Sequence, residues 1–232
     1  MDPDILQLLL DGGSDDDVLL WMLADDDDKD DGWRDVVFSL DACTEEQCKT
    51  MFRFYREDIY SLCMYLHIPD SIVAENNSKA RGIDALCMLL RRFSYPNRLS
   101  DLQYIFGRSE SELSLLIKAM LNHIYENFSY LVSNMNNRFM QEPYLSRYAD
   151  AISSKCPLNN VFGFIDGTLR PISRPGQNQR DCFSGHKRIH GIKFQSIMLP
   201  SGLIGNMFGP ISGRRHDSFM LHESGILPEL QN

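Results

Sequence analysis

The sequence contains no long hydrophobic run. No apolar stretch reaches the roughly 18 residues that a membrane-spanning helix needs, so no membrane association is expected. The first four residues, Met1 to Asp4, carry none of the positive side chains that open a secretory signal. We therefore expect the protein to remain inside the cell.

The sequence also lacks the cysteine pattern of a zinc site. Cys43 and Cys48 are close together, but no second Cys/His pair at zinc-binding spacing follows them. Cys63 and Cys87 lie in apolar runs, which is typical of small buried side chains. The pattern favours reduced thiols over a metal site.

Positive charge is scarce overall, but the shortage is confined to one end of the chain. The 232 residues have a net charge of −9 and a pI of about 5.1. Residues 1–35 hold 13 Asp against only Lys29 and Arg34, so the remaining residues sum to +2. Residues 161–232 have a net charge of +3 and four of the six His. The acidic pI therefore says little about what the folded part binds.

Residues 1–40 are predicted to form an acidic, disordered tail. Apolar runs at 5–10 and 18–23 alternate with acidic runs at 15–17 and 25–28. Such alternation is typical of a disordered interaction segment. A solvated tail without a partner is the other interpretation, because blocks of like charge repel one another and stay extended.

Residues 41–150 are predicted to form an all-helical domain. Thr44 and Gln47 match a capping box that opens a helix running to about Leu66. Apolar residues at helical spacing predict a second helix over 81–93.

A helix-turn-helix layout follows in the same domain. A short helix over 101–106, a turn at 107–109 and a longer helix over 110–128 give this order. A plain helical hairpin has the same layout. Glu110 and Glu112 would repel phosphate at the start of a recognition helix, although they suit the helix dipole. Both interpretations stay open.

Residues 155–232 have the character of a mixed α/β or α+β domain. Short apolar runs predict strands over 160–165, 189–199 and 203–211, of which the last two form a hairpin. A helix is expected to begin at His216 and Asp217. We place Asp166 at the end of the central strand.

Two carboxylates are candidates for metal chemistry. Asp166, after a strand and before a glycine, offers the oxygen ligand that Mg²⁺ prefers, or it forms an Asx-type turn. Asp217 is a second ligand, or it satisfies free N–H groups at a helix start. We expect the carboxylates of Asp166 and Asp217 to open on one cleft.

A cluster of basic residues surrounds the predicted hairpin. Cations with interleaved Phe side chains suit a nucleic-acid backbone, or they protect a sheet edge from aggregation. Arg214 and Arg215 are expected to be more exposed than Phe219 and Leu221. The predicted nucleic-acid-binding residues are Arg180, Lys187, Arg188, Lys193, Arg214 and Arg215.

Five stretches of residues 160–232 resemble the PIF/Harbinger transposase-derived nuclease family, which has a DDE-type endonuclease domain. They are Gly163–Thr168, Gln179–Arg180, Gly185–Lys187, Lys193–Gln195 and Gly213–Ser218. The resemblance implies a ribonuclease-H-like fold and DNA cleavage with a divalent metal cation, Mg²⁺ or Mn²⁺. It implies that Asp166 is the first catalytic acid and that both Asp166 and Asp217 are metal positions. It further implies a nuclear protein, with DNA and a Myb-like DNA-binding protein as partners.

The later motifs of that family have no counterpart in this sequence. Neither its Gly-Asp-x-Gly-Tyr-like strand end nor its final glutamate is found, so we expect a partial domain, truncated at the C-terminus, with weak or no activity. A non-catalytic remnant that binds DNA or protein is the alternative. A decayed coding sequence without a stable fold is the third.

Overall fold

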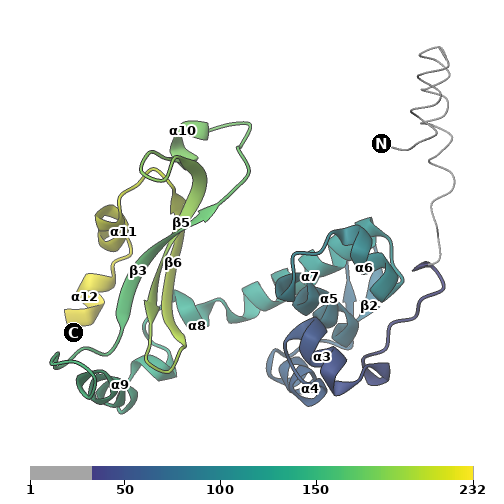
Figure 1. Ribbon diagram of the computed structural model, residues 1–232, viewed down its shortest axis with the longest axis horizontal. Helices are drawn as coiled ribbons and strands as arrows, with labels where there is room; N and C mark the ends of the chain where they lie inside the picture. Colours follow the sequence, from purple (N-terminus) through teal and green to yellow (C-terminus); the bar gives the residue numbers. More distant parts are fainter. Residues whose placement is uncertain (1–32, 232) are drawn as a thin grey trace, which may run out of the picture. The chain divides into compact units, whose positions relative to one another are not determined.

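The computed structural model describes residues 33–231, which divide into two compact units, 33–124 and 125–231 (Figure 1). The predicted acidic tail, 1–40, lies almost wholly outside the described residues. Its last residues belong to the first unit, where Leu40 is buried and the ring of Phe38 lies 4.7 Å from that of Phe106. No helix among the described residues has the length and apolarity to cross a membrane.

The first unit packs five helices around one apolar core. The core includes Phe52, Ile59, Leu86, Leu102 and Leu113, each fully buried or nearly so. The short η2 (Leu40–Ala42) precedes α3 (Glu45–Phe52), α4 (Arg56–Tyr65), α5 (Gly82–Ser94), α6 (Leu99–Phe106) and α7 (Glu110–Phe128). The helix-turn-helix layout of α6 and α7 is confirmed, with Gly107 in the left-handed conformation between them.

Two expectations for this unit are wrong. The capping box at Thr44 is present, but the helix predicted to run to Leu66 breaks into α3 and α4 at Arg53, whose φ of 67° is left-handed. The region is also not all-helical, because β1 (Ser71–Val73) and β2 (Lys79–Arg81) form an antiparallel hairpin. Asn77, with φ of 65°, supplies the left-handed turn residue between these strands.

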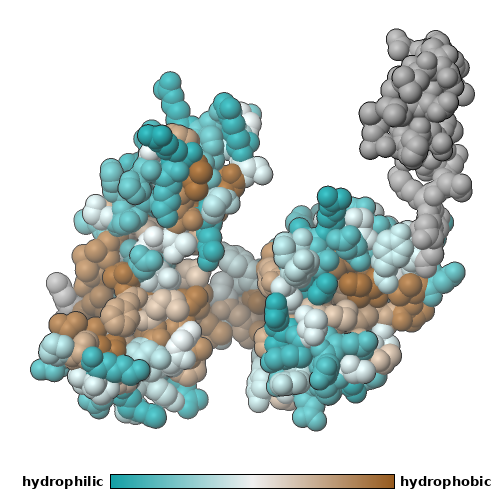
Figure 2. All heavy atoms as spheres, in the orientation of Figure 1, coloured by the Kyte–Doolittle hydropathy of each residue, from teal (hydrophilic) through white to brown (hydrophobic). Residues whose placement is uncertain are grey.

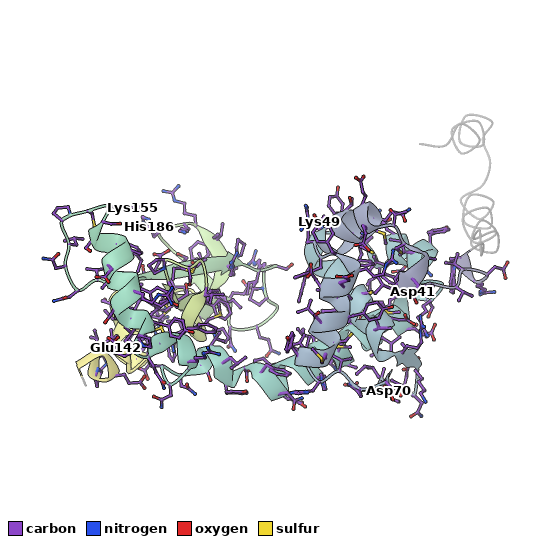
Figure 3. All side chains as sticks on the ribbon, turned by 90° about the horizontal axis from the view of Figure 1, so that it is seen from below. Asp41, Lys49, Asp70, Glu142, Lys155 and His186 are labelled. Atoms are coloured by element: carbon purple, nitrogen blue, oxygen red, sulfur yellow. The ribbon has the colours of Figure 1, made fainter. Side chains whose placement is uncertain are left out.

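The second unit combines short helices with one antiparallel sheet. The helices are α8 (Tyr130–Ser133), η3 (Arg138–Met140), α9 (Tyr144–Ser153), α10 (Gln179–Cys182), α11 (Asp217–Glu223) and α12 (Ile226–Gln231). Figure 3 shows α9 between the labelled Glu142 and Lys155. The core of this unit joins Met140 and Tyr148 to Ile197 and Ile226.

The sheet is built around β5. The strands are β3 (Phe164–Pro171), β4 (Phe183–Ser184), β5 (Ile189–Met198) and β6 (Ile204–Ser212), and each of the other three pairs with β5. The predicted 189–199 and 203–211 hairpin is confirmed as β5 and β6. The mixed fold is confirmed, with a helical first part and an antiparallel sheet that is compatible with the start of a ribonuclease-H-like fold.

The position predicted for Asp166 in this sheet is wrong. Asp166 belongs to β3, and among the described residues β3 pairs only with β5, so the central strand is β5. Strand order depends on pairing between distant segments, and the apolar run at 160–165 carries no information about its neighbours.

Candidate functional site

Asp166 is the third residue of β3 rather than the residue that ends it. Its backbone pairs with Ser196 of β5, and the strand continues to Pro171. The strand before Asp166 is not buried either, since Ile165 is 45% exposed. The Asx-turn interpretation is therefore wrong, and Asp166 is an exposed carboxylate on a regular strand.

Asp217 is the first residue of α11, and its side chain forms an ion pair. Its Oδ1 lies 2.7 Å from Nζ of Lys193 on β5. The Asp217 side chain is 66% exposed, whereas that of Lys193 is only 14% exposed. Asp217 thus complements the dipole at a helix N-terminus and pairs with the ammonium group of a lysine whose side chain is mostly buried.

Asp166 and Asp217 both border one hollow of about 190 Å³ between β3, β5 and α11. Gly167 and Gln195 line it as well. A Cβ at Gly167 would lie 3.1 Å from Cγ of Asp217, so the glycine lets α11 approach β3 closely. The Nε2 of the buried Gln195 donates to Oγ of Ser224, which ties β5 to the end of α11.

The direction of the two carboxylates differs within this arrangement. Gly167 faces α11, and neighbouring residues of a strand point to opposite faces of the sheet, so the Cβ of Asp166 points away from α11. The alternation fixes only the direction of the Asp166 side chain. A residue can also line a hollow through its backbone atoms. Asp166 and Asp217 thus border one hollow as residues, but the Asp166 side chain lies on the opposite face of β3 from Asp217. The expectation that both carboxylates open on one cleft is therefore wrong.

The described residues match a divalent cation in ligand type but not in ligand number. Carboxylate oxygens are the ligands that Mg²⁺ prefers, and Mg²⁺ keeps several waters when few protein ligands are present. Within residues 33–231 no three His, Cys, Asp or Glu side chains gather closely enough to hold a metal ion. Asp166 is the residue best placed to hold a hydrated cation, because Asp217 already pairs with Lys193.

The predicted nucleic-acid-binding residues do not form one uniform patch. Arg180 on α10 and Arg214 line a common pocket. Lys187 and Arg188 are exposed in the turn between β4 and β5. Lys193 differs from them, because it is largely buried against Asp217 and so is not an exposed cation. Figure 2 shows hydrophilic residues gathered over the end of this unit that carries α10.

The loop before α11 is exposed, as expected. The Arg214 side chain is 56% exposed, compared with 38% for Phe219, and Leu221 is half-buried. Arg215 is exposed too, and its guanidinium lies 4.5 Å from the ring centroid of Phe219. Both arginines are therefore within reach of a ligand in solvent.

The start of α7 is not a typical DNA-reading surface. Glu110 and Glu112 lie in its first turn, and Glu112 pairs with Arg108 at 3.7 Å. Lys118 pairs with Glu75 at 2.8 Å. Because Arg108 and Lys118 are held in ion pairs, the geometry favours a structural helical hairpin.

The comparison with known proteins concerns the part of the chain that contains the hollow and the loop with Arg214 and Arg215. No match is found among curated proteins or solved structures. Residues 165–232, less than a third of the chain, match the family model described as DDE superfamily endonuclease. The matched residues begin one position before Asp166 and include Asp217, Arg180 and Arg214. From β3 onward this protein is therefore similar to the DDE superfamily endonucleases.

Proposed function

We propose that the second unit is the endonuclease part of a transposase-derived protein of the PIF/Harbinger type, which acts on DNA with the aid of Mg²⁺ or Mn²⁺. The observation that carries the proposal is the family match over 165–232, in which Asp166 and Asp217 border one hollow. The exposed Arg214 and Arg215, in the loop before α11, provide charges that a phosphate backbone needs.

The roles of the residues follow from their positions. Asp166 would hold the cation, which when bound polarises the scissile phosphate and activates water. Lys193 holds Asp217 in place at the start of α11. Arg215 and Arg214 would orient the DNA backbone, because guanidinium groups match phosphate geometry.

The low number of carboxylates argues for weak cleavage. DDE-type chemistry with two metals needs about three carboxylates, and Asp166 and Asp217 are two. A non-catalytic DNA- or protein-binding remnant is the second candidate function. It is favoured by the ion pair that already occupies Asp217.

The remaining parts of the proposal concern partners and location. Since the first turn of α7 carries Glu110 and Glu112, we propose that a separate Myb-like protein supplies sequence-specific DNA binding. Because the proposed substrate is DNA, we propose that the protein acts in the nucleus.

Nicking of supercoiled plasmid by the purified chain in Mg²⁺ and in Mn²⁺ tests the proposal. We expect slow nicking that Asp166→Asn abolishes and that Glu223→Gln, a change to another exposed acid of the same unit, leaves intact. Nicking that survives Asp166→Asn would overturn the assignment of Asp166. DNA binding without any nicking would instead support the non-catalytic remnant.

A further inference from the structure

A second, larger pocket is lined by residues of α10, β4, β5 and the loop before α11. Figure 1 shows α10 at the end of the sheet away from α12. The volume of the pocket is about 490 Å³, which lies in the range of small-molecule sites. The residues that line it are Gln179, Arg180, Phe183, Gly185, His190 and Arg214. Neither Asp166 nor Asp217 is among them.

One wall of this pocket is aromatic. Phe183 of β4 and His190 of β5 are cross-strand partners, and their ring centroids lie 5.3 Å apart at an interplanar angle of 60°. Phe183 is 40% exposed, so part of its ring is left uncovered. An aromatic side chain that lines an open pocket is available for stacking.

Two arginines, Arg180 and Arg214, also line the pocket. Arg180 is exposed on α10, and the backbone N–H of Arg214 donates to the carbonyl of Asp181. The Arg214 guanidinium is 3.6 Å from the Asp181 carboxylate, and both side chains are more than half exposed. Such an exposed pair is weak, so a phosphate can compete for Arg214.

The position of Arg214 is fixed by its loop. The Oγ of Ser212 also donates to the carbonyl of Asp181. A Cβ at Gly213 would lie 2.3 Å from the carbonyl oxygen of Gly191, so the loop packs directly on β5. The backbone that carries Arg214 is therefore held against α10 and β5.

An aromatic ring beside two arginines matches the chemistry of a nucleotide. A base stacks on an aromatic face, and guanidinium groups bind the adjoining phosphates. Lys187 and Arg188 are exposed in the turn between β4 and β5, where they extend the positive charge that a nucleic-acid strand would meet. A base that is paired within a duplex is stacked between its neighbours and does not reach such a wall.

From this geometry we infer that the pocket between α10 and β4 binds an unpaired nucleotide of a DNA strand, with the base against Phe183 and the phosphates at Arg180 and Arg214. This inference rests on the proposed function, since it makes DNA the ligand. It adds a preference for distorted or single-stranded DNA that phosphate contacts alone do not provide.

Fluorescence anisotropy with two labelled duplexes tests the inference. One duplex is fully paired, and the other carries a single unpaired nucleotide. The full chain is used in EDTA, so that binding is measured without cleavage. We expect the bulged duplex to bind about tenfold more tightly. Phe183→Ala should remove this preference, and Phe183→Tyr should retain it. Arg180→Ala should weaken binding to both duplexes and lower the salt slope by about one.

Two glycines provide a variant that blocks the pocket and a matched control that does not. A Cβ at Gly185, which lines the pocket, or at Gly176, which does not, meets no atom within 4 Å. Gly185→Leu should abolish the preference for the bulged duplex, whereas Gly176→Leu should leave it unchanged. Circular dichroism verifies that each variant is folded.

Equal binding of the two duplexes by the wild-type chain would overturn the inference. Equal behaviour of Gly185→Leu and Gly176→Leu would overturn it as well. Because all measurements are made in EDTA, a lack of nuclease activity has no effect on these outcomes. Failure of the inference is thus distinguishable from failure of the proposed cleavage.

Discussion

The ion pair between Lys193 and Asp217 is asymmetric in its exposure. Lys193 is 14% exposed and Asp217 is 66% exposed, at a distance of 2.7 Å. Removing the carboxylate leaves the ammonium of a mostly buried side chain without its partner, whereas removing the ammonium leaves an acid that water solvates.

We therefore expect Asp217→Ala to lower the free energy of unfolding by about 1–3 kcal/mol. Lys193→Met, which keeps the aliphatic packing, should cost less than about 1 kcal/mol. Urea unfolding measures both changes. A larger loss for Lys193→Met would show that the ammonium group itself stabilises the sheet.

Gly213 is required by close packing rather than by backbone conformation. A Cβ at this position would lie 2.3 Å from the carbonyl oxygen of Gly191 and 2.8 Å from that of Cys182. Backbone atoms on paired strands cannot give way easily, so Gly213→Ala should cost about 1–3 kcal/mol.

Gly185→Ala is the matched control for that substitution, because a Cβ at Gly185 meets no atom within 4 Å. It should change the unfolding free energy by less than about 0.5 kcal/mol. Similar unfolding midpoints for the two variants in urea would contradict the packing argument.

The thiol of Cys87 should be unreactive in the folded protein. Cys87 is fully buried, and burial raises the pKa of its thiol far above the usual range for cysteine. A raised pKa keeps the thiol protonated at pH 8, and only the thiolate reacts with iodoacetamide. Mass spectrometry should detect alkylation of half-buried Cys156 well before that of Cys87. Equal rates would indicate that the first unit opens readily.

At the scale of elements, the break between α3 and α4 has a local cause. Arg53 is exposed and left-handed at the end of α3, and its N–H donates to the carbonyl of Lys49. Tyr55 is the N-cap of α4, and its N–H donates to the carboxylate of Asp58. A left-handed conformation strains any residue with a Cβ, and the capping hydrogen bonds offset this strain.

Arg53→Gly should consequently stabilise the protein by about 0.5–1 kcal/mol, because glycine adopts the left-handed conformation without strain. Arg53→Ala keeps the Cβ and should be nearly neutral. Thermal unfolding followed by circular dichroism compares the two variants. Destabilisation by glycine would indicate that the Arg53 side chain makes a stabilising contact.

For the whole molecule, the distribution of charge matters more than the net charge. Residues 1–35 have a net charge of −11, and residues 161–232 have +3. The acidic segment lowers the electrostatic attraction of the chain for a polyanion, whatever its conformation.

Removal of residues 1–32 should therefore increase the affinity for DNA at low salt. The increase should shrink as the ionic strength rises, because salt screens the repulsion between the acidic segment and DNA phosphates that are not in contact with it. Anisotropy titrations of the full chain and of the chain without residues 1–32 measure the effect. They cover about 50 to 300 mM salt, the range over which such binding changes most. An unchanged affinity at low salt would show that the acidic segment does not act on the DNA-binding surface.

Local features of this protein follow from its sequence alone. The capping box at Thr44, the bounds of α7, the β5–β6 hairpin and the helix start at Asp217 agree with the expectations. Each depends on side chains only a few positions apart, through capping hydrogen bonds, turn residues and hydrophobic spacing. The prediction that Asp166 is a site residue also depends on adjacent residues, through a motif that resembles a known family.

Tertiary structure decided which residues meet. Strand pairing placed β5 at the centre of the sheet, placed Asp166 within β3, and set Lys193 against Asp217, which is 24 positions away. It also brought Arg180 and Arg214 to one pocket beside Phe183. These contacts depend on register and on the close approach permitted by Gly167 and Gly213, which no pattern of neighbouring residues encodes.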